Sequence, residues 1–182
     1  MTQEFNTQER RRILAFVREV IDRELHNAPM PEAPEIPGLD ERRSCFVTLH
    51  DCCGNLRGCI GNLEPFEPLK ENLVRNALNA AFSDPRFPPL EPEELRETVI
   101  EVSILTLPEP IADPLKFELG VDGIILRQGG RGAVFLPQVA PEQGWDQRTT
   151  LEYLSRKAGL PADGWWQPGT LFQTFRAEVF GE

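Results

Sequence analysis

The chain has 182 residues, of which 40% are hydrophobic, and its formal net charge is −10. This length suits one domain with a sizeable core, or a domain with a small second lobe. A chain this acidic repels a phosphate backbone unless it concentrates its arginines, so the composition disfavours nucleic-acid binding.

The sequence also bears on the compartment. It begins with charged residues instead of an apolar signal region, and it contains no run of about 18 apolar residues. We therefore expect a cytoplasmic protein that does not enter a membrane. In a reducing compartment the cysteines at positions 45, 52, 53 and 59 are expected to be thiols, because disulfide frameworks belong to oxidising environments.

Hydrophobic periodicity divides the chain into helices and strands. In chain order it predicts a helix at 7–27, strands at 45–50 and 56–61, a helix at 68–82, a helical turn at 91–95, strands at 98–107, 123–127 and 132–136, a short turn or helix at 137–143, a helix at 148–158 and a strand at 171–180. Hairpins between neighbouring strands imply antiparallel pairing. The fold class is therefore α+β, with a mainly antiparallel or mixed sheet of five or six strands flanked by helices.

The first two strands are predicted to form a β-hairpin, because Gly54 and Asn55 between them tolerate turn conformations. If these two residues form the loop, His50 lies opposite Cys59. A four-residue loop moves the pairing but keeps the same faces. Side chains alternate along strands, so one face of the hairpin should meet the core with three apolar residues: Leu49, Leu56 and Ile60.

The other face carries a candidate nucleophile, Cys59. A reactive thiol needs a lowered pKa, which a nearby cation favours, and Arg57 and His50 share its face. Gly58 and Gly61 would leave backbone N–H groups open to a substrate oxygen. The alternative is that Cys59 is a small buried hydrophobe, and that the glycines allow close packing of a helix.

A metal site built from His50 and the neighbouring cysteines is not expected. Zinc sites use spacings such as CxxC, which let the ligands converge. Cys52 and Cys53 are adjacent, so they should project to opposite faces of a strand. The sequence contains no second ligand cluster.

Three arginines are candidates for binding an anionic ligand: Arg57, Arg86 and Arg131. The guanidinium fork matches the geometry of a carboxylate or phosphate. The alternative is that each arginine pairs with a carboxylate of the protein itself. Trp145 is expected to line a pocket or to pack in the core. Loop carboxylates such as Asp84 are candidates for an acid or base, but such groups are usually solvated, and we expect solvation here.

Five ordered blocks resemble the AMMECR domain family, which is named after the chromosomal region of Alport syndrome, midface hypoplasia and elliptocytosis. They are LRGCIG at 56–61, DPRFPPL at 84–90, LGVDGI at 119–124, FLPQVAPEQGWD at 135–146 and RKAGL at 156–160. The resemblance runs from about residue 13 to residue 180 in a single domain, 1–182. It implies an α+β fold with a larger and a smaller lobe.

The resemblance also implies site residues and partners. Prokaryotic members are called AmmeMemoRadiSam system protein A, which implies action with Memo-like and radical SAM proteins. This chain lacks the radical SAM cysteine triad, so it would be the A component alone. The site candidates at motif positions are Arg57, Gly58, Cys59, Gly61, Arg86, Gln143 and Trp145.

Two functions remain open from the sequence. The first is an enzyme-like protein, a Cys59-dependent transferase or hydrolase, which binds a small anionic ligand in a cleft lined by the blocks at 56–61 and 84–90. The second is a non-catalytic ligand-binding or scaffold protein. The family resemblance implies neither a reaction nor a cofactor.

Overall fold

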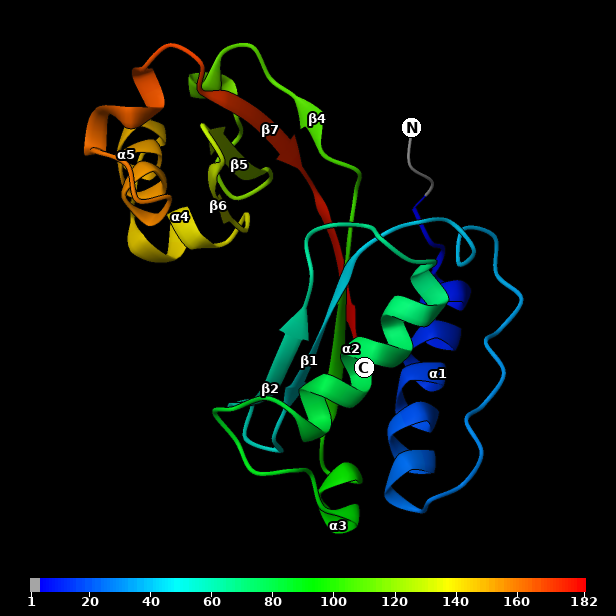
Figure 1. Cartoon of the computed structure of the whole chain (residues 1–182). Helices are drawn as coiled ribbons and strands as arrows, with labels where there is room; N and C mark the ends of the chain where they lie inside the picture. The colour runs from blue at the N-terminus through cyan, green and yellow to red at the C-terminus, as the bar shows by residue number, and fades with distance from the viewer. Residues whose placement is uncertain (1–3) are drawn as a thin grey trace. The chain divides into compact units, whose positions relative to one another are not determined.

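The computed structural model describes residues 4–182 (Figure 1), and the chain divides into two compact units. Unit 1 ends at Leu105 and resumes with Glu178–Glu182, whereas unit 2 is Thr106–Ala177. The predicted α+β class is confirmed. Within the described residues the strands form two antiparallel sheets of four strands, one in each unit, where the pattern indicated a single sheet.

Unit 1 places two long helices against one face of its sheet (Figure 1). The strand order is β2-β1-β3-β8. In chain order the elements are α1 (Thr7–Leu25), β1 (Cys45–His50), β2 (Leu56–Gly61), α2 (Leu69–Phe82), α3 (Pro92–Leu95), β3 (Val99–Leu105) and β8 (Ala177–Gly181). None of the helices in the described chain is long and apolar enough to cross a membrane.

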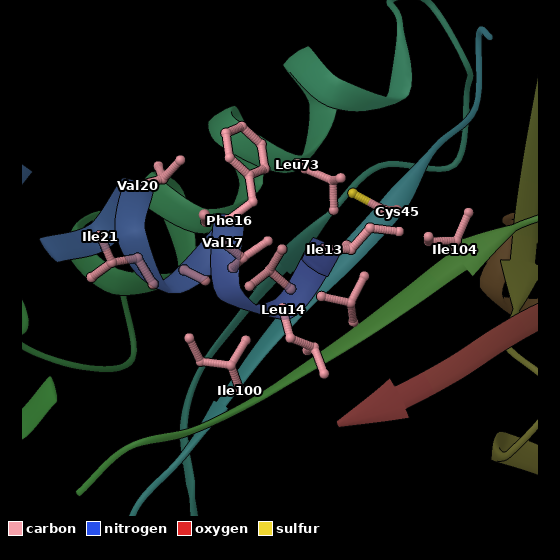
Figure 2. Packing of buried hydrophobic residues seen from close by; sticks show 14 of the residues in the cluster. Ile13, Leu14, Phe16, Val17, Val20, Ile21, Cys45, Leu73, Ile100 and Ile104 are labelled. Carbon is pink, nitrogen blue, oxygen red and sulfur yellow. The ribbon is translucent and has the colours of Figure 1, made fainter. Parts of the chain in front are cut away.

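The core of unit 1 forms where the apolar stripe of α1 meets the sheet. The helix begins in a capping box, in which the Asn6 side chain accepts from the Glu9 backbone N–H and the Glu9 side chain accepts from the Asn6 backbone N–H. Figure 2 shows Ile13 of α1 near Cys45 of β1 and Ile104 of β3, all in one buried cluster. Each such side chain, fully removed from water, contributes about 1.5–3 kcal/mol of hydrophobic stabilisation.

Unit 2 has the strand order β4-β7-β5-β6 and its own small core. Its elements are β4 (Glu109–Pro110), η1 (Pro114–Lys116), β5 (Gly123–Gln128), β6 (Arg131–Phe135), α4 (Val139–Gln143), α5 (Gln147–Lys157), η2 (Ala162–Trp166) and β7 (Leu171–Phe175). Asp146 caps α5 by accepting the Thr149 backbone N–H at 2.7 Å. The helix then buries Leu151 and Leu154.

The prediction of one strand at 171–180 is wrong, because the chain changes sheets at Arg176. The Arg176 backbone N–H donates to Thr106 Oγ1 at 2.8 Å, and its carbonyl accepts the Thr106 N–H at 2.8 Å. Its Nε also donates to Asp122 Oδ1 at 3.1 Å. β7 therefore ends in unit 2, and β8 completes the sheet of unit 1.

The hairpin of β1 and β2 is confirmed with the predicted strand bounds. Its register is the one expected for a four-residue loop, so Thr48 lies opposite Cys59. A bulge beyond Leu49 then places Leu56 opposite His50, and Leu56 is 40% exposed. The prediction that Leu56 meets the core is therefore wrong. The other two apolar residues pack as expected: Leu49 and Ile60.

Candidate functional site

A pair of loop residues closes the edge of the unit 1 sheet at Cys59. β2 is an edge strand, and edge strands leave backbone groups open to other chains. Here the Cys59 backbone N–H donates to Asp84 Oδ2 at 2.9 Å, and the Cys59 carbonyl accepts from Arg86 Nη2 at 3.1 Å. Asp84 and Arg86 thus take the place of a neighbouring strand at this residue.

Asp84 and Arg86 form a two-pronged ion pair. Arg86 Nε donates to Asp84 Oδ1 at 2.9 Å, and Nη2 donates to Oδ2 at 2.7 Å. The Arg86 guanidinium holds the pKa of the Asp84 carboxyl far below its usual range, and Asp84 raises the pKa of Arg86. The expectation of a solvated Asp84 is wrong, because this residue is only 4% exposed.

Arg57 is held by a second carboxylate, that of Glu94 on α3. Its Nε and Nη2 donate to the two Glu94 oxygens at 2.9 and 3.0 Å, and Nη2 also donates to the Pro89 carbonyl at 3.4 Å. Arg57 lowers the pKa of Glu94 by this bonding. The Arg57 Nη1 atom is buried, yet none of the described residues accepts a hydrogen bond from it.

The two arginines converge on one aromatic ring. The guanidinium carbon of Arg57 lies 6.0 Å from the Phe87 ring centroid, and that of Arg86 lies 5.6 Å from it. At such distances a cation is attracted to the face of a ring. The blocks at 56–61 and 84–90 therefore meet around Phe87, and α3 supplies Glu94 as a third contributor.

Cys59 lies on the sheet face turned away from α2, with its thiol half-buried. Thr48 Oγ1 donates to the Cys59 Sγ atom at 3.2 Å. His50 lies two residues further along β1, opposite Leu56, and no hydrogen bond within the described chain joins His50 to Cys59. The Arg86 guanidinium interacts electrostatically with the Cys59 thiol.

Both glycines of the first block are needed for close packing. A Cβ atom on Gly58 would lie 2.2 Å from the Ala80 carbonyl oxygen of α2. A Cβ on Gly61 would lie 2.3 Å from the ring of Phe46. These contacts give both glycines a structural role that requires no substrate.

Unit 2 contains three of the site candidates, Arg131, Gln143 and Trp145, whereas the other candidates belong to unit 1. The Trp145 ring stacks on Tyr153, with the centroids 4.2 Å apart and the planes at 2°, and it also lies 5.8 Å from the Phe135 ring. Gln143 is exposed at the end of α4. Trp145 is therefore part of an aromatic cluster of unit 2.

The comparisons with known proteins agree with the sequence blocks. The family model described as AMMECR1 matches residues 14–180. The chain belongs to the AMMECR1 family. A protein from Methanothermobacter thermautotrophicus is 43% identical over 182 residues, covering 96% of this chain and 94% of the relative. One from Thermococcus gammatolerans is 42% identical over 181 residues, covering 93% and 88%.

A solved structure matches this chain as well. The crystal structure of an uncharacterised protein from Pyrococcus horikoshii is 39% identical to this chain, with a TM-score of 0.77. It covers 93% of this chain, and the match covers 89% of that protein. The resemblance noted in the sequence is therefore confirmed for the family and the fold, and the reaction has to be argued from the site.

Sequence reasoning missed a buried amide cluster in this AMMECR1 fold. The Cys45 backbone N–H donates to Asn72 Oδ1 at 2.9 Å, and Asn76 Nδ2 donates to the Cys45 carbonyl at 3.0 Å. Burial raises the pKa of the Cys45 thiol to about 12, so this thiol is unreactive at neutral pH. Two asparagines one turn apart on the apolar side of a predicted helix were the signal available. Glu94 and Thr48 were also missed, and no motif marks either of them.

The cysteines of the hairpin loop are not arranged as expected. Cys52 and Cys53 lie in the turn, and their Sγ atoms are 3.9 Å apart, so the prediction of opposite faces is wrong. Strand alternation does not apply in a turn. Within residues 4–182, no group of three or more His, Cys, Asp or Glu side chains is placed to hold a metal ion.

Replacing Cys59 by serine tests whether this thiol is mainly a packing group. Because Thr48 would offer the new hydroxyl a partner, we expect a loss of unfolding free energy below about 1 kcal/mol. Thermal unfolding followed by circular dichroism measures this loss. A decrease of several kcal/mol would contradict the expectation and would identify Cys59 as a core residue.

Proposed function

We propose that this AMMECR1 protein is enzyme-like and binds a small anionic ligand where the blocks at 56–61 and 84–90 meet. The observation that carries the proposal is the buried Nη1 group of Arg57, which lacks a hydrogen-bond partner among the described residues. A buried donor left unpaired costs about 1–3 kcal/mol, and more when the group is charged. A ligand oxygen that accepts this hydrogen bond would recover that free energy.

The charges around the arginines narrow the ligand class. Glu94 and Asp84 already pair with Arg57 and Arg86, so little net positive charge is left for a polyphosphate. A small ligand with a single carboxylate group fits better, since it would need one charge-assisted hydrogen bond from Arg57. The Arg86 side chain is 53% exposed and remains accessible as a second contact.

Cys59 is the candidate reacting group of a transferase or hydrolase. It lies beside Arg86, and its backbone is held by the Asp84–Arg86 pair. Following the family resemblance, we also propose that the protein acts with Memo-like and radical SAM partners.

One observation favours a second function, that of a non-catalytic binding or scaffold protein. A nucleophilic thiol is normally activated by a neighbouring base. The hydrogen bond to the Cys59 sulfur comes instead from Thr48, whose hydroxyl is not a base at neutral pH. The two functions differ in one result. If the protein is an enzyme, Cys59→Ser keeps ligand binding and abolishes turnover of that ligand. If it is a scaffold protein, the wild type shows no turnover and Cys59→Ser leaves ligand binding unchanged.

Replacing Arg57 by lysine is expected to weaken binding of a small carboxylate about 5- to 150-fold, because lysine cannot keep both the Glu94 pair and the free donor. Titration calorimetry against a panel of mono- and dicarboxylic acids, with inorganic phosphate for comparison, measures the change. Arg96→Lys is the matched control, since Arg96 is an exposed arginine of the same unit. Equal affinities for the wild type and Arg57→Lys would end the proposal.

A further inference from the structure

The tip of the hairpin carries two neighbouring thiols that the proposed function does not use. Cys52 and Cys53 are both exposed, and their sulfur atoms are 3.9 Å apart. They lie at the opposite end of β2 from Gly61, in the turn that joins β1 to β2.

The turn that presents these thiols is held by Asp51. Its Oδ1 atom accepts the backbone N–H groups of Cys53 and Asn55 at 2.8 and 2.9 Å, and its Oδ2 accepts from Asn55 Nδ2 at 2.9 Å. Gly54 adopts a positive φ of 81° and closes the turn by donating its N–H to the Asp51 carbonyl at 2.9 Å. Because the backbone is fixed in this way, the two thiols are presented together.

The distances between Cys52 and Cys53 favour binding of one atom by both sulfurs over a direct disulfide bond. Adjacent Cα atoms joined by a trans peptide are about 3.8 Å apart, which is less than the roughly 4.4–6.8 Å of ordinary disulfides, so a direct bond between Cys52 and Cys53 would be strained. An atom bonded to both sulfurs at about 2.3 Å, as in metal thiolates, separates them by about 3.3–4.0 Å when the bond angle is about 90–120°, as in three-coordinate centres. The observed 3.9 Å lies within this range.

The surroundings of the pair are acidic. Asp51 and Glu97 are close enough to interact electrostatically with Cys52. Negative neighbours favour a cation or an electron-poor centre over an anion. Within the described chain no third His, Cys, Asp or Glu joins the two sulfurs to form a metal-binding group, so the site does not suit zinc, which takes four ligands.

We propose that Cys52 and Cys53 form a chelating dithiol site for a soft, thiophilic centre of low coordination number, such as Cu(I) or trivalent arsenic. Soft thiolate ligands select such centres over Mg²⁺ or Ca²⁺. With phenylarsine oxide, the arsenic forms two As–S bonds and stays trivalent. Its oxygen leaves as water together with the two thiol protons.

The test uses the full-length reduced protein and phenylarsine oxide, with intact mass and peptide mapping as the measurements. We expect one phenylarsenic adduct that spans Cys52 and Cys53, withstands excess glutathione and is removed by dithiothreitol. Cys52→Ser and Cys53→Ser should each weaken retention by about a hundredfold, because chelation through two linked groups is lost. Cys59→Ser is the matched control and should leave this adduct unchanged.

The same variants are then titrated with Cu(I) against a competing chelator, and the same ranking is expected. Because both residues are exposed, their serine variants should keep the wild-type melting temperature, which separates loss of the site from loss of the fold. The proposal would be overturned by an adduct on Cys59, by removal of the wild-type adduct by glutathione, or by a single serine variant that retains the adduct as well as the wild type does.

Discussion

Replacing Gly58 by alanine is expected to destabilise unit 1 by about 3 kcal/mol, the upper end of the usual cost of overpacking. The new Cβ would lie 2.2 Å from the Ala80 carbonyl oxygen and 3.1 Å from its carbon. These are backbone atoms of α2, so they cannot rotate away as a side chain would. Relief requires β2 and α2 to separate, which would open the core around Leu49.

The measurement for Gly58→Ala has to report on unit 1. All the tryptophans and the single tyrosine of the chain lie in unit 2, so intrinsic fluorescence reports on that unit. Amide hydrogen exchange of β2 and α2 is the suitable probe. Gly181→Ala is the control in the same sheet, because its Cβ would approach the Ile100 carbonyl only to 3.3 Å. Equal stability of the two variants would contradict the predicted clash.

Replacing Asp84 by asparagine is expected to cost about 1.5–3 kcal/mol at neutral pH. The asparagine amide cannot accept all the hydrogen bonds that the carboxylate accepts from Arg86 and Cys59, and its NH₂ group would face another donor. The Arg86 side chain is half-exposed, so water partly compensates for its lost partner and keeps the cost below that of a fully buried pair.

The stability loss in Asp84→Asn is also expected to depend on pH. The pKa of Asp84 is lower in the folded state than its ordinary value of 3.8, so its contribution to stability is complete above about pH 5 and is lost as pH falls through the folded-state pKa. The difference in unfolding free energy between wild type and Asp84→Asn should therefore be constant from about pH 5 to 8 and shrink below about pH 4. Asp40→Asn, at an exposed ion pair with Lys70, should change stability by less than about 1 kcal/mol. A difference that does not depend on pH down to pH 2 would show that Asp84 does not act through its charge.

The helices and strands of this fold were largely predictable, because the periodicity of apolar residues indicates where each of them lies. The hairpin strands have the predicted bounds. The division into two sheets was not predictable, since the alternation at 171–180 continues through Arg176. The change of sheet depends on hydrogen bonds between Arg176 and Thr106, 70 residues apart in sequence.

The candidate site was predictable in part. Motif positions indicated Arg57, Cys59 and Arg86, and these lie together in unit 1. Their partners were not predictable, because Glu94 lies on a short helix and is separated from Arg57 by 37 residues with no pattern between them. The placement of His50 opposite Cys59 failed because a bulge and the loop length set the register, and neither follows from alternation.

The discontinuous course of unit 1 has a consequence for synthesis on the ribosome. β3 is made before unit 2, but its neighbour β8 is made only afterwards. At about 5–20 residues per second, the nascent β3 waits roughly 4–14 s for that strand. Unit 2 can thus be complete before the first sheet closes, and closure also brings Glu178 and Glu182 to Arg10 and Arg18 of the first helix. The part of the protein made first is therefore the part that finishes folding last.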